Sequence, residues 1–407
     1  MKNTLARRLN RIEPSATMQI TAIAAQLKAE GKDIVGFGAG EPDFDTPANI
    51  KEAAKKALDE GKTKYTSVAG VLEFRKAIAD KLKKENSLDY KPSQIIVSCG
   101  GKQALYNVIM ALVNPEDEVI IPGPYWVSYR DIVLLAEGEP TILPTTIDKN
   151  FKISPEQLES SITKKTKAII LNSPSNPTGT VYSADELREF AEILKKHPQV
   201  WIITDDIYEK ILYDGSSFVN IVMAAPELKE RTVVINGLSK GYAMTGWRLG
   251  YAATDNPELL KAIAKIQGQS TSHATTFAQY GGMEALTGDQ SAVSEMLEAF
   301  TKRRDYMHKR INEMNGLQAI KPGGAFYIFP DIQELSQKES FIQLQKKYNE
   351  KSLSKTLAKV LLEDYMVAVV PGIAFGADNG IRLSYATSME LIEKGLNRME
   401  EFFSSLK

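Results

Sequence analysis

The sequence has little of what metal sites and disulfides require. Its 407 residues include one cysteine, Cys99, which excludes an intramolecular disulfide. The three histidines, His197, His273 and His308, are scattered without the spacing of metal ligands. We therefore predict no metal and no zinc or iron site built on His and Cys, and leave open only a carboxylate site for a hard cation. Sparse cysteine is typical of proteins from reducing compartments, so we expect a cytoplasmic protein.

The chain also lacks an excess of charge of either sign. It has 50 Lys and Arg against 51 Asp and Glu, a formal net charge of −1, which predicts no nucleic-acid partner. It contains no apolar run of about 18 residues and no apolar stretch at its start, so we expect neither a membrane span nor a secretory signal. Hydrophobic residues make up 43% and charged residues 25%, which is typical of a globular protein.

Short apolar runs separated by helical segments fill the middle of the chain. The runs lie at residues 95–98, 119–121, 168–171, 200–203 and 232–235. Continuous apolar runs of this length are typical of parallel strands that are buried on both faces. We therefore predict an α/β fold whose mainly parallel sheet is flanked by helices.

The pattern changes near residue 290. Charged helical segments at 290–320 and 335–364 alternate with short apolar runs, and an amphipathic helix follows at 389–403. We predict a smaller α+β domain that combines residues 290–407 with residues 1–45 as an N-terminal arm. Residues 46–289 would then form the large domain.

Polar residues follow several predicted strands, where open α/β sheets bind their ligands. Residues 98–102 include Gly100 and Gly101 and open a helix, whose N–H groups and dipole favour a phosphate. Asn176 lies between two prolines that stiffen its loop, which suits an amide aimed at a ligand. Ordinary turns would explain either segment alone.

Two further strand ends carry reactive groups. Asp205 follows a buried strand directly, and a desolvated carboxylate needs a positive or protonated partner. A helix N-cap is the more common role of such a residue and would account for Asp206. Lys240 is a nucleophilic amine if its surroundings lower its pKa, although most lysines are solvated. Arg248 follows shortly after it and suits a phosphate.

These groups together match the functional groups of pyridoxal 5′-phosphate, whose ring is an electron sink. The helix start and Arg248 would hold the phosphate, and Asp205 would face a protonated ring nitrogen. Lys240 would condense with the aldehyde, while Asn176 and Tyr208 would donate to the phenolate oxygen.

Nearly the whole chain resembles the fold-type I aminotransferases of class I and II, and among them a bacterial group of aspartate aminotransferases. Matching segments occur in order at 39–47, 64–65, 100–105, 124–129, 176–179, 205–208, 239–248 and 382–385. The resemblance implies ping-pong transfer of an amino group from L-aspartate to 2-oxoglutarate, which gives oxaloacetate and L-glutamate.

The resemblance also implies roles for single residues. Lys240, Asp205 and Tyr208 would be catalytic, with Lys240 both binding the cofactor and moving the substrate proton. Trp126 would stack on the cofactor ring, and Gly101, Lys102 and Arg248 would bind its phosphate. Tyr65 would reach the phosphate of a second subunit in a homodimer.

Substrate binding by the resemblance rests on Arg382, which would clamp the α-carboxylate in a bidentate fork with help from Gly40, Asn176 and Trp126. The side chains of Lys102 and Ser15 would read the distal carboxylate. The wider family often has a phosphate-binding serine where this chain has Gly237. Residues 36–40 mimic a dinucleotide fingerprint, but no helix is expected to follow them, and we reject that interpretation.

Three alternatives stay open at this point. The chain could act on aromatic, prephenate-type or alanine substrates, or it could be a pyridoxal-phosphate β-lyase that cleaves carbon–sulfur bonds. A regulator that uses the fold only to sense a ligand is the third.

Overall fold

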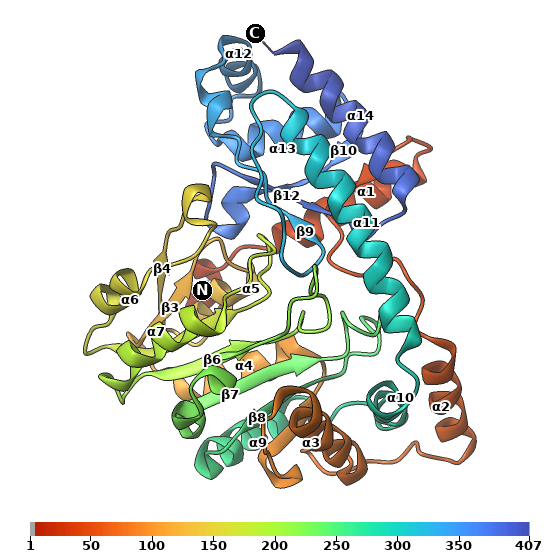
Figure 1. Cartoon of the computed structure of the whole chain (residues 1–407), viewed down its shortest axis with the longest axis vertical. Coiled ribbons are helices and arrows are strands. Elements are labelled where there is room, and N and C mark those ends of the chain that lie inside the picture. The colour runs from red at the N-terminus through yellow and green to blue at the C-terminus, as the bar shows by residue number, and fades with distance from the viewer. Residues whose placement is uncertain (1–4, 407) are drawn as a thin grey trace.

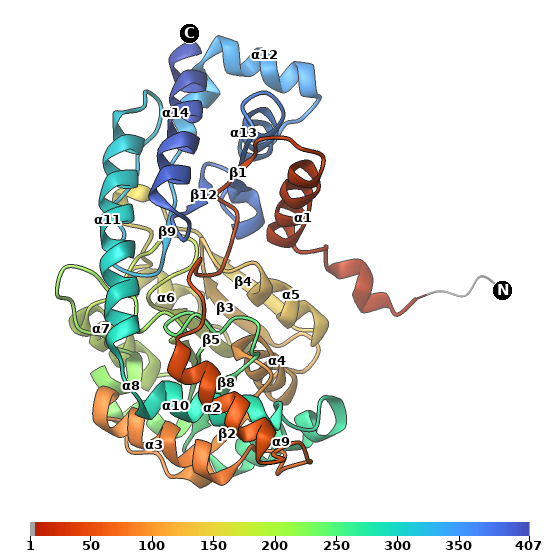
Figure 2. The same ribbon diagram turned by 90° about the vertical axis from the view of Figure 1, so that its right-hand side faces the viewer.

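The computed structural model describes residues 5–406. A sheet covered by helices occupies the lower part of Figure 1, and a smaller, mostly helical part lies above it. The long helix α11 (Ser291–Glu313) runs along one side and connects the two parts. In Figure 2, α1 (Ala16–Ala29) lies beside the upper part.

Seven strands form the lower sheet in the order β2-β8-β7-β6-β5-β3-β4, and β8 is antiparallel to both of its neighbours while the other pairs are parallel. The strands are β2 (Ile95–Ser98), β3 (Glu118–Pro122), β4 (Glu139–Leu143), β5 (Thr166–Asn172), β6 (Trp201–Asp205), β7 (Thr232–Gly237) and β8 (Gly250–Thr254). The predicted α/β class is confirmed. Our sequence interpretation missed β4, which lies at the sheet edge, and β8, in which glycine and alanine make up three of the five residues.

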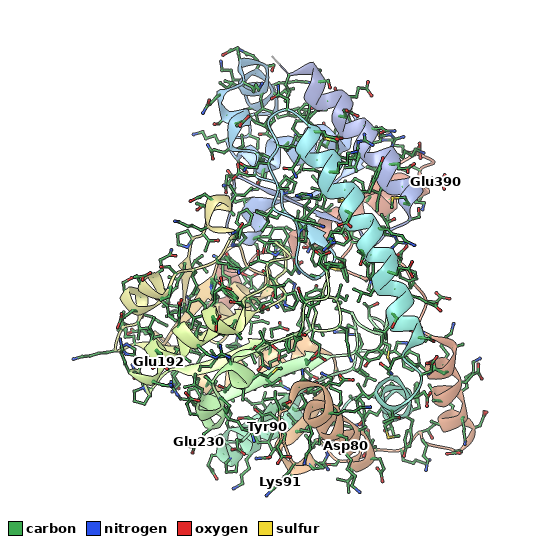
Figure 3. All side chains as sticks on the ribbon, in the orientation of Figure 1. Asp80, Tyr90, Lys91, Glu192, Glu230 and Glu390 are labelled. Atoms are coloured by element: carbon green, nitrogen blue, oxygen red, sulfur yellow. The ribbon has the colours of Figure 1, made fainter. Side chains whose placement is uncertain are left out.

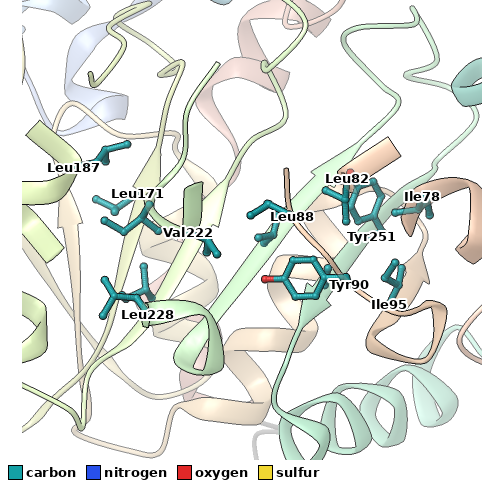
Figure 4. Close-up of a cluster of buried hydrophobic side chains, with 14 of the residues drawn as sticks. Ile78, Leu82, Leu88, Tyr90, Ile95, Leu171, Leu187, Val222, Leu228 and Tyr251 are labelled. Carbon is teal, nitrogen blue, oxygen red and sulfur yellow. The ribbon is translucent and has the colours of Figure 1, made fainter. Parts of the chain in front are cut away.

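Both faces of this sheet are buried, which explains its continuous apolar runs. Alternate residues of each strand point to opposite faces, so Ile169 joins one core cluster and Ile170 the other. The first cluster includes residues of α3 (Leu72–Asn86), α7 (Ala184–Lys195) and α10 (Thr276–Thr287), and Figure 4 shows part of it. The second includes residues of α4 (Gly101–Leu112), α5 (Ser128–Leu135) and α9 (Pro257–Ser270).

The upper part joins the two ends of the chain. Strand β1 (Val35–Gly36) pairs in parallel with β10 (Val367–Ala368), while β11 (Val370–Pro371), β12 (Ile381–Ser384) and β9 (Tyr327–Ile328) form an antiparallel sheet. The helix α14 (Met389–Ser405) closes this part. The strands of this part are shorter than the apolar runs that predicted them. The run 324–329 contains only β9, and the run 367–370 is divided between β10 and β11.

The predicted helical segment 335–364 is confirmed as mostly helical, and it is divided into separate elements. It contains a 3₁₀ turn (Gln333–Gln337), α12 (Glu339–Tyr348) and α13 (Leu353–Glu363). Asn349 adopts a left-handed backbone and ends α12, and the Ser352 hydroxyl accepts from the N–H of Lys355 and begins α13.

Charged side chains surround this framework. Glu192, Glu230 and Glu390 lie at its rim in Figure 3. Within residues 5–406, no helix is both long and apolar enough to cross a bilayer.

Gly250 allows the start of α4 to approach β8. A Cβ atom at this position would overlap the backbone of Gly100 and Gly101. We expect Gly250→Ala to lower the free energy of unfolding by about 1–3 kcal/mol, since the overlapped atoms belong to the backbone and no side-chain rotation can relieve the overlap. Urea unfolding would measure this. The matched control is Gly36→Ala, where a Cβ meets nothing within 4 Å. Equal unfolding midpoints for the two variants would contradict the prediction.

Candidate active site

A cavity of about 430 Å³ opens at the carboxyl ends of β5, β6 and β7, between the two parts of the molecule. The structure brings almost all of the predicted site residues to its wall: Ser15, Gly40, Gly101, Lys102, Trp126, Asn176, Asp205, Tyr208, Lys240, Arg248 and Arg382. Tyr65 lies elsewhere, with 92% of its surface exposed and its ring edge-on to His273.

Lys240 reaches the cavity from the loop after β7. Its ammonium group donates to the carbonyl of Gly40 and lies 5.9 Å from the centre of the Phe326 ring. Burial lowers the pKa of Lys240 to about 8, and the positive charge of Arg382 adds to this effect. A large fraction of the amine is therefore neutral and nucleophilic near pH 8.

Asp205 ends β6 and is 6% exposed. The hydroxyl of Tyr129 donates to its Oδ2 at 2.7 Å, and the N–H of Ile207 donates to its Oδ1 at 3.4 Å. Burial nevertheless raises the pKa of Asp205 to about 6, because these hydrogen bonds offset only part of the desolvation. A cation beside this carboxylate would restore its charge.

Asp206 is not a helix N-cap, contrary to that interpretation of the sequence. It accepts hydrogen bonds from Thr204 Oγ1 at 2.6 Å and Asn220 Nδ2 at 2.7 Å. Asn220 is the residue that caps a helix, α8 (Ile221–Ala224), through its side-chain oxygen. Burial raises the pKa of Asp206 to about 7. Asp206 therefore ties β6 to α8 and points away from the cavity wall.

Arg382 lies on β12 and is 1% exposed. Its Nη1 donates to Asn176 Oδ1 at 3.1 Å and its Nη2 to the Gly38 carbonyl at 2.8 Å. Among the described residues, its buried Nε has no hydrogen-bond partner. A guanidinium with a donor to spare in a cavity is suited to bind a carboxylate.

The opposite end of the cavity combines a helix start with two cations. Arg248 has a positive φ of 55° and donates to Thr245 O at 2.9 Å and Cys99 O at 3.4 Å, beside the first turn of α4. Lys102 places its Nζ 4.9 Å from the Trp126 ring centre, and burial together with Arg248 lowers the pKa of Lys102. Helix N–H groups and cations together favour an anion such as phosphate.

Steric crowding explains why this chain has a glycine, and not a serine, at position 237. A Cβ atom there would lie 2.9 Å from the carbonyl oxygen of Leu249 and 3.1 Å from Gly250 Cα, which are both backbone atoms. A serine would therefore not fit without moving β8. The neighbouring Asn236 has a buried Nδ2 that lacks a partner within residues 5–406.

Sequence reasoning missed several residues of the site. Tyr327 lines the cavity, its hydroxyl lies 2.9 Å from that of Tyr208, and its ring lies 4.4 Å from the Arg382 guanidinium carbon. Tyr129 holds Asp205, and the Gly38 carbonyl holds Arg382. The aromatic run 324–329 was the only available signal for Tyr327. No group of His, Cys, Asp and Glu side chains in the described chain could hold a metal ion.

Comparison with known proteins identifies the family. The model of the family "Aminotransferase class I and II" matches residues 32–399. The chain belongs to the class I and II aminotransferases.

Relatives of this aminotransferase match it from end to end. An aspartate/prephenate aminotransferase of Nitrosomonas europaea is 48% identical and covers 98% of this chain and 100% of its own. An aspartate aminotransferase of Bacillus subtilis is 46% identical, with 98% of each chain covered. The crystal structure of the Rhizobium meliloti aspartate aminotransferase has a TM-score of 0.93 at 43% identity, with both chains fully covered at 100%. The Thermus thermophilus aspartate aminotransferase with maleate has a TM-score of 0.89 at 40% identity, with 98% and 99% covered.

Proposed function

We propose that this aminotransferase uses pyridoxal 5′-phosphate to move the amino group of L-aspartate to 2-oxoglutarate. The observation that carries the proposal is one cavity that contains a buried amine, a buried carboxylate and a carboxylate-binding guanidinium, namely Lys240, Asp205 and Arg382. Support for the substrate comes from relatives named aspartate aminotransferase and from maleate, a dicarboxylate, in the Thermus structure.

The residues present fit the cofactor. Asp205 is a buried carboxylate with a raised pKa. A protonated ring nitrogen beside it would lower that pKa again and stabilise the charged carboxylate. The glycines at the start of α4 leave backbone N–H groups open beside Arg248, where a phosphate would bind. Trp126 offers a ring face, and Tyr208 and Asn176 offer polar groups for the phenolic oxygen.

The proposed mechanism assigns a separate task to each side chain. When bound, pyridoxal phosphate supplies an aldehyde for the amine and a ring that accepts the electron pair left at Cα. Lys240 removes the Cα proton of the substrate as a neutral amine and returns it on the cofactor side. Arg382 holds the α-carboxylate so that the Cα–H bond faces Lys240, while Lys102 and Ser15 receive the distal carboxylate.

The assembly of the protein is part of the proposal. We infer a homodimer in which the exposed Tyr65 reaches the phosphate bound by a second copy, because its side chain has no role in its own cavity. We propose that residues 46–289 form one domain and that 290–407 with 1–45 form the other, of which 1–4 and 407 lie outside the described residues. The single Cys99 favours a cytoplasmic location.

The absorption spectrum of the purified protein tests the proposal. L-Aspartate added alone should convert the visible band of the pyridoxal form into the shorter-wavelength band of the pyridoxamine form and release oxaloacetate. The subsequent addition of 2-oxoglutarate should restore the first band. A protein that shows no such band after reconstitution with pyridoxal phosphate would contradict the cofactor. A band that ignores aspartate would contradict the substrate alone.

Prephenate is the second candidate acceptor, because the Nitrosomonas relative is named for both activities. The same spectrum distinguishes the two. Prephenate added to the pyridoxamine form should restore the pyridoxal band if the chain accepts it.

Replacing Lys102 by methionine should weaken aspartate selectivity if this side chain reads the distal carboxylate, and should leave it unchanged otherwise.

The depressed pKa of Lys240 predicts how cofactor attachment depends on pH. Only the neutral amine attacks an aldehyde, and its pKa is about 8 instead of the ordinary 10.5. The rate at which cofactor-free protein binds pyridoxal phosphate covalently should therefore rise with pH, reach half of its maximum near pH 8 and level off above that pH. Stopped-flow absorbance would measure the rate. A rate that still climbs toward pH 10 would mean that Lys240 keeps an ordinary pKa.

A further inference from the structure

The segment 37–47, here called the strap, crosses from the upper part of the molecule to the lower part along the cavity. Its first residue, Phe37, still joins the upper part through backbone hydrogen bonds with Ala368 and Ser384. Beyond it, the carbonyls of Gly38 and Gly40 accept from Arg382 and Lys240. The position of the strap therefore fixes two functional side chains at once.

Side-chain hydrogen bonds hold the strap in place. The Thr245 hydroxyl donates to Glu41 Oε2 at 2.8 Å, and Thr46 Oγ1 donates to Ala243 O at 2.6 Å. Both contacts tie the strap to the loop that follows Lys240. Neither of them connects the strap to the long helix α11.

Two contacts make that connection: the ring of Phe44 lies edge-on to that of Phe300 of α11 at 5.6 Å, and Arg303 of α11 adds the hydrogen bonds. Its Nη1 and Nη2 donate to Asp43 Oδ1 and Oδ2 at 2.7 and 3.0 Å, a bidentate pair. The side chains are 11% and 28% exposed, so water screens the pair only in part. The guanidinium carbon also lies 5.0 Å from the ring centre of Phe44 and 5.7 Å from that of Phe300. Two parallel hydrogen bonds fix orientation as well as distance, which a single contact would not do.

We propose that Arg303 is a positioning residue for the substrate carboxylate: through Asp43 it holds the strap so that the Gly38 carbonyl orients Arg382. This inference rests on the proposed function of Arg382. When the pair is lost, the strap keeps its contacts with the loop after Lys240 and the edge-on contact of Phe44 with Phe300, but it loses its hydrogen-bonded link to α11. The Gly38 carbonyl is then held mainly through its neighbour Phe37, and Arg382 is oriented less firmly. Binding of a carboxylate should weaken more than the chemical step slows.

The test compares Arg303→Met with Lys302→Met in the cofactor-loaded enzyme. Lys302 is the adjacent residue of α11 and forms an exposed pair with Glu298, with both side chains 69% exposed, which makes it a matched control. For Arg303→Met we expect the KM for L-aspartate and the calorimetric Kd for maleate to rise about five- to tenfold, with kcat nearly unchanged. Lys302→Met should leave all three at their original values. Asp43→Asn should repeat the effect, and Arg303→Lys should restore only part of the affinity.

Hydrogen exchange of the peptide that contains the strap gives a readout independent of activity. Its amides should exchange faster in Arg303→Met and Asp43→Asn than in Lys302→Met. Unchanged exchange together with unchanged maleate affinity would overturn the inference. An affinity loss as large in Lys302→Met would also overturn it. If the unmodified enzyme neither reacts with aspartate nor binds maleate, the proposed function fails instead, while the exchange comparison still decides whether Arg303 holds the strap.

Discussion

Replacing Lys240 by alanine should abolish turnover without unfolding the protein. The variant loses the amine that the proposed mechanism uses as the proton carrier, and general acid–base catalysis alone contributes about 10²–10⁴-fold. Loss of covalent attachment removes a further contribution, so we expect kcat to fall by at least about 10⁴-fold. The measurement is the rate of oxaloacetate formation from L-aspartate in a single turnover. This rate does not depend on release of the cofactor.

A second lysine variant separates the role of Lys240 from a general loss of charge. The side chain of Lys261 is 74% exposed and pairs with Glu258 on the surface, so Lys261→Ala should keep full activity. The Lys240→Ala protein should still bind pyridoxal phosphate, because Asp205 and Arg248 are untouched, but borohydride reduction should fix none of it to the variant while fixing it to the unmodified protein. Turnover close to that of the unmodified enzyme would contradict the assignment of Lys240.

The residues predicted best are those at the ends of parallel strands. Asp205 ends β6 and Lys240 follows β7, and these two strands are neighbours in the sheet. Their side chains had to meet, because parallel strands bring their carboxyl ends to one edge. Arg382 required the family resemblance, since its strand belongs to a different sheet.

Other residues of the site could not be predicted, because their positions depend on strand pairing and side-chain contacts that the sequence does not show. Tyr327 lies beside Ser384 because β9 pairs with β12 in one particular register. A shift of one residue would turn its ring to the other face. Asp206 was misjudged because its partner Asn220 lies on a separate element, α8. Contacts of this kind follow from the packed fold and leave no local signature.

The carboxylate of Asp205 gives the second large prediction. Asp205→Asn keeps the size of the side chain and can still bond to Tyr129, but it cannot hold a proton on the ring nitrogen by its charge. The ring would then be a weaker acceptor of the electron pair at Cα. We expect the barrier to rise by about 4 kcal/mol, on the order of 10³-fold in kcat/KM. Steady-state kinetics with L-aspartate and 2-oxoglutarate measure this.

The adjacent Asp206 provides the control that distinguishes catalysis from burial. Both carboxylates are almost fully buried, at 6% and 1% exposed, and both have raised pKa values because of desolvation. Asp206 bonds to Thr204 and Asn220 instead of lining the cavity. Asp206→Asn should therefore lower the free energy of unfolding by about 1–3 kcal/mol and leave kcat/KM nearly unchanged. If the two variants lost activity equally, burial of a charge would explain both, and the ring-nitrogen role of Asp205 would be wrong.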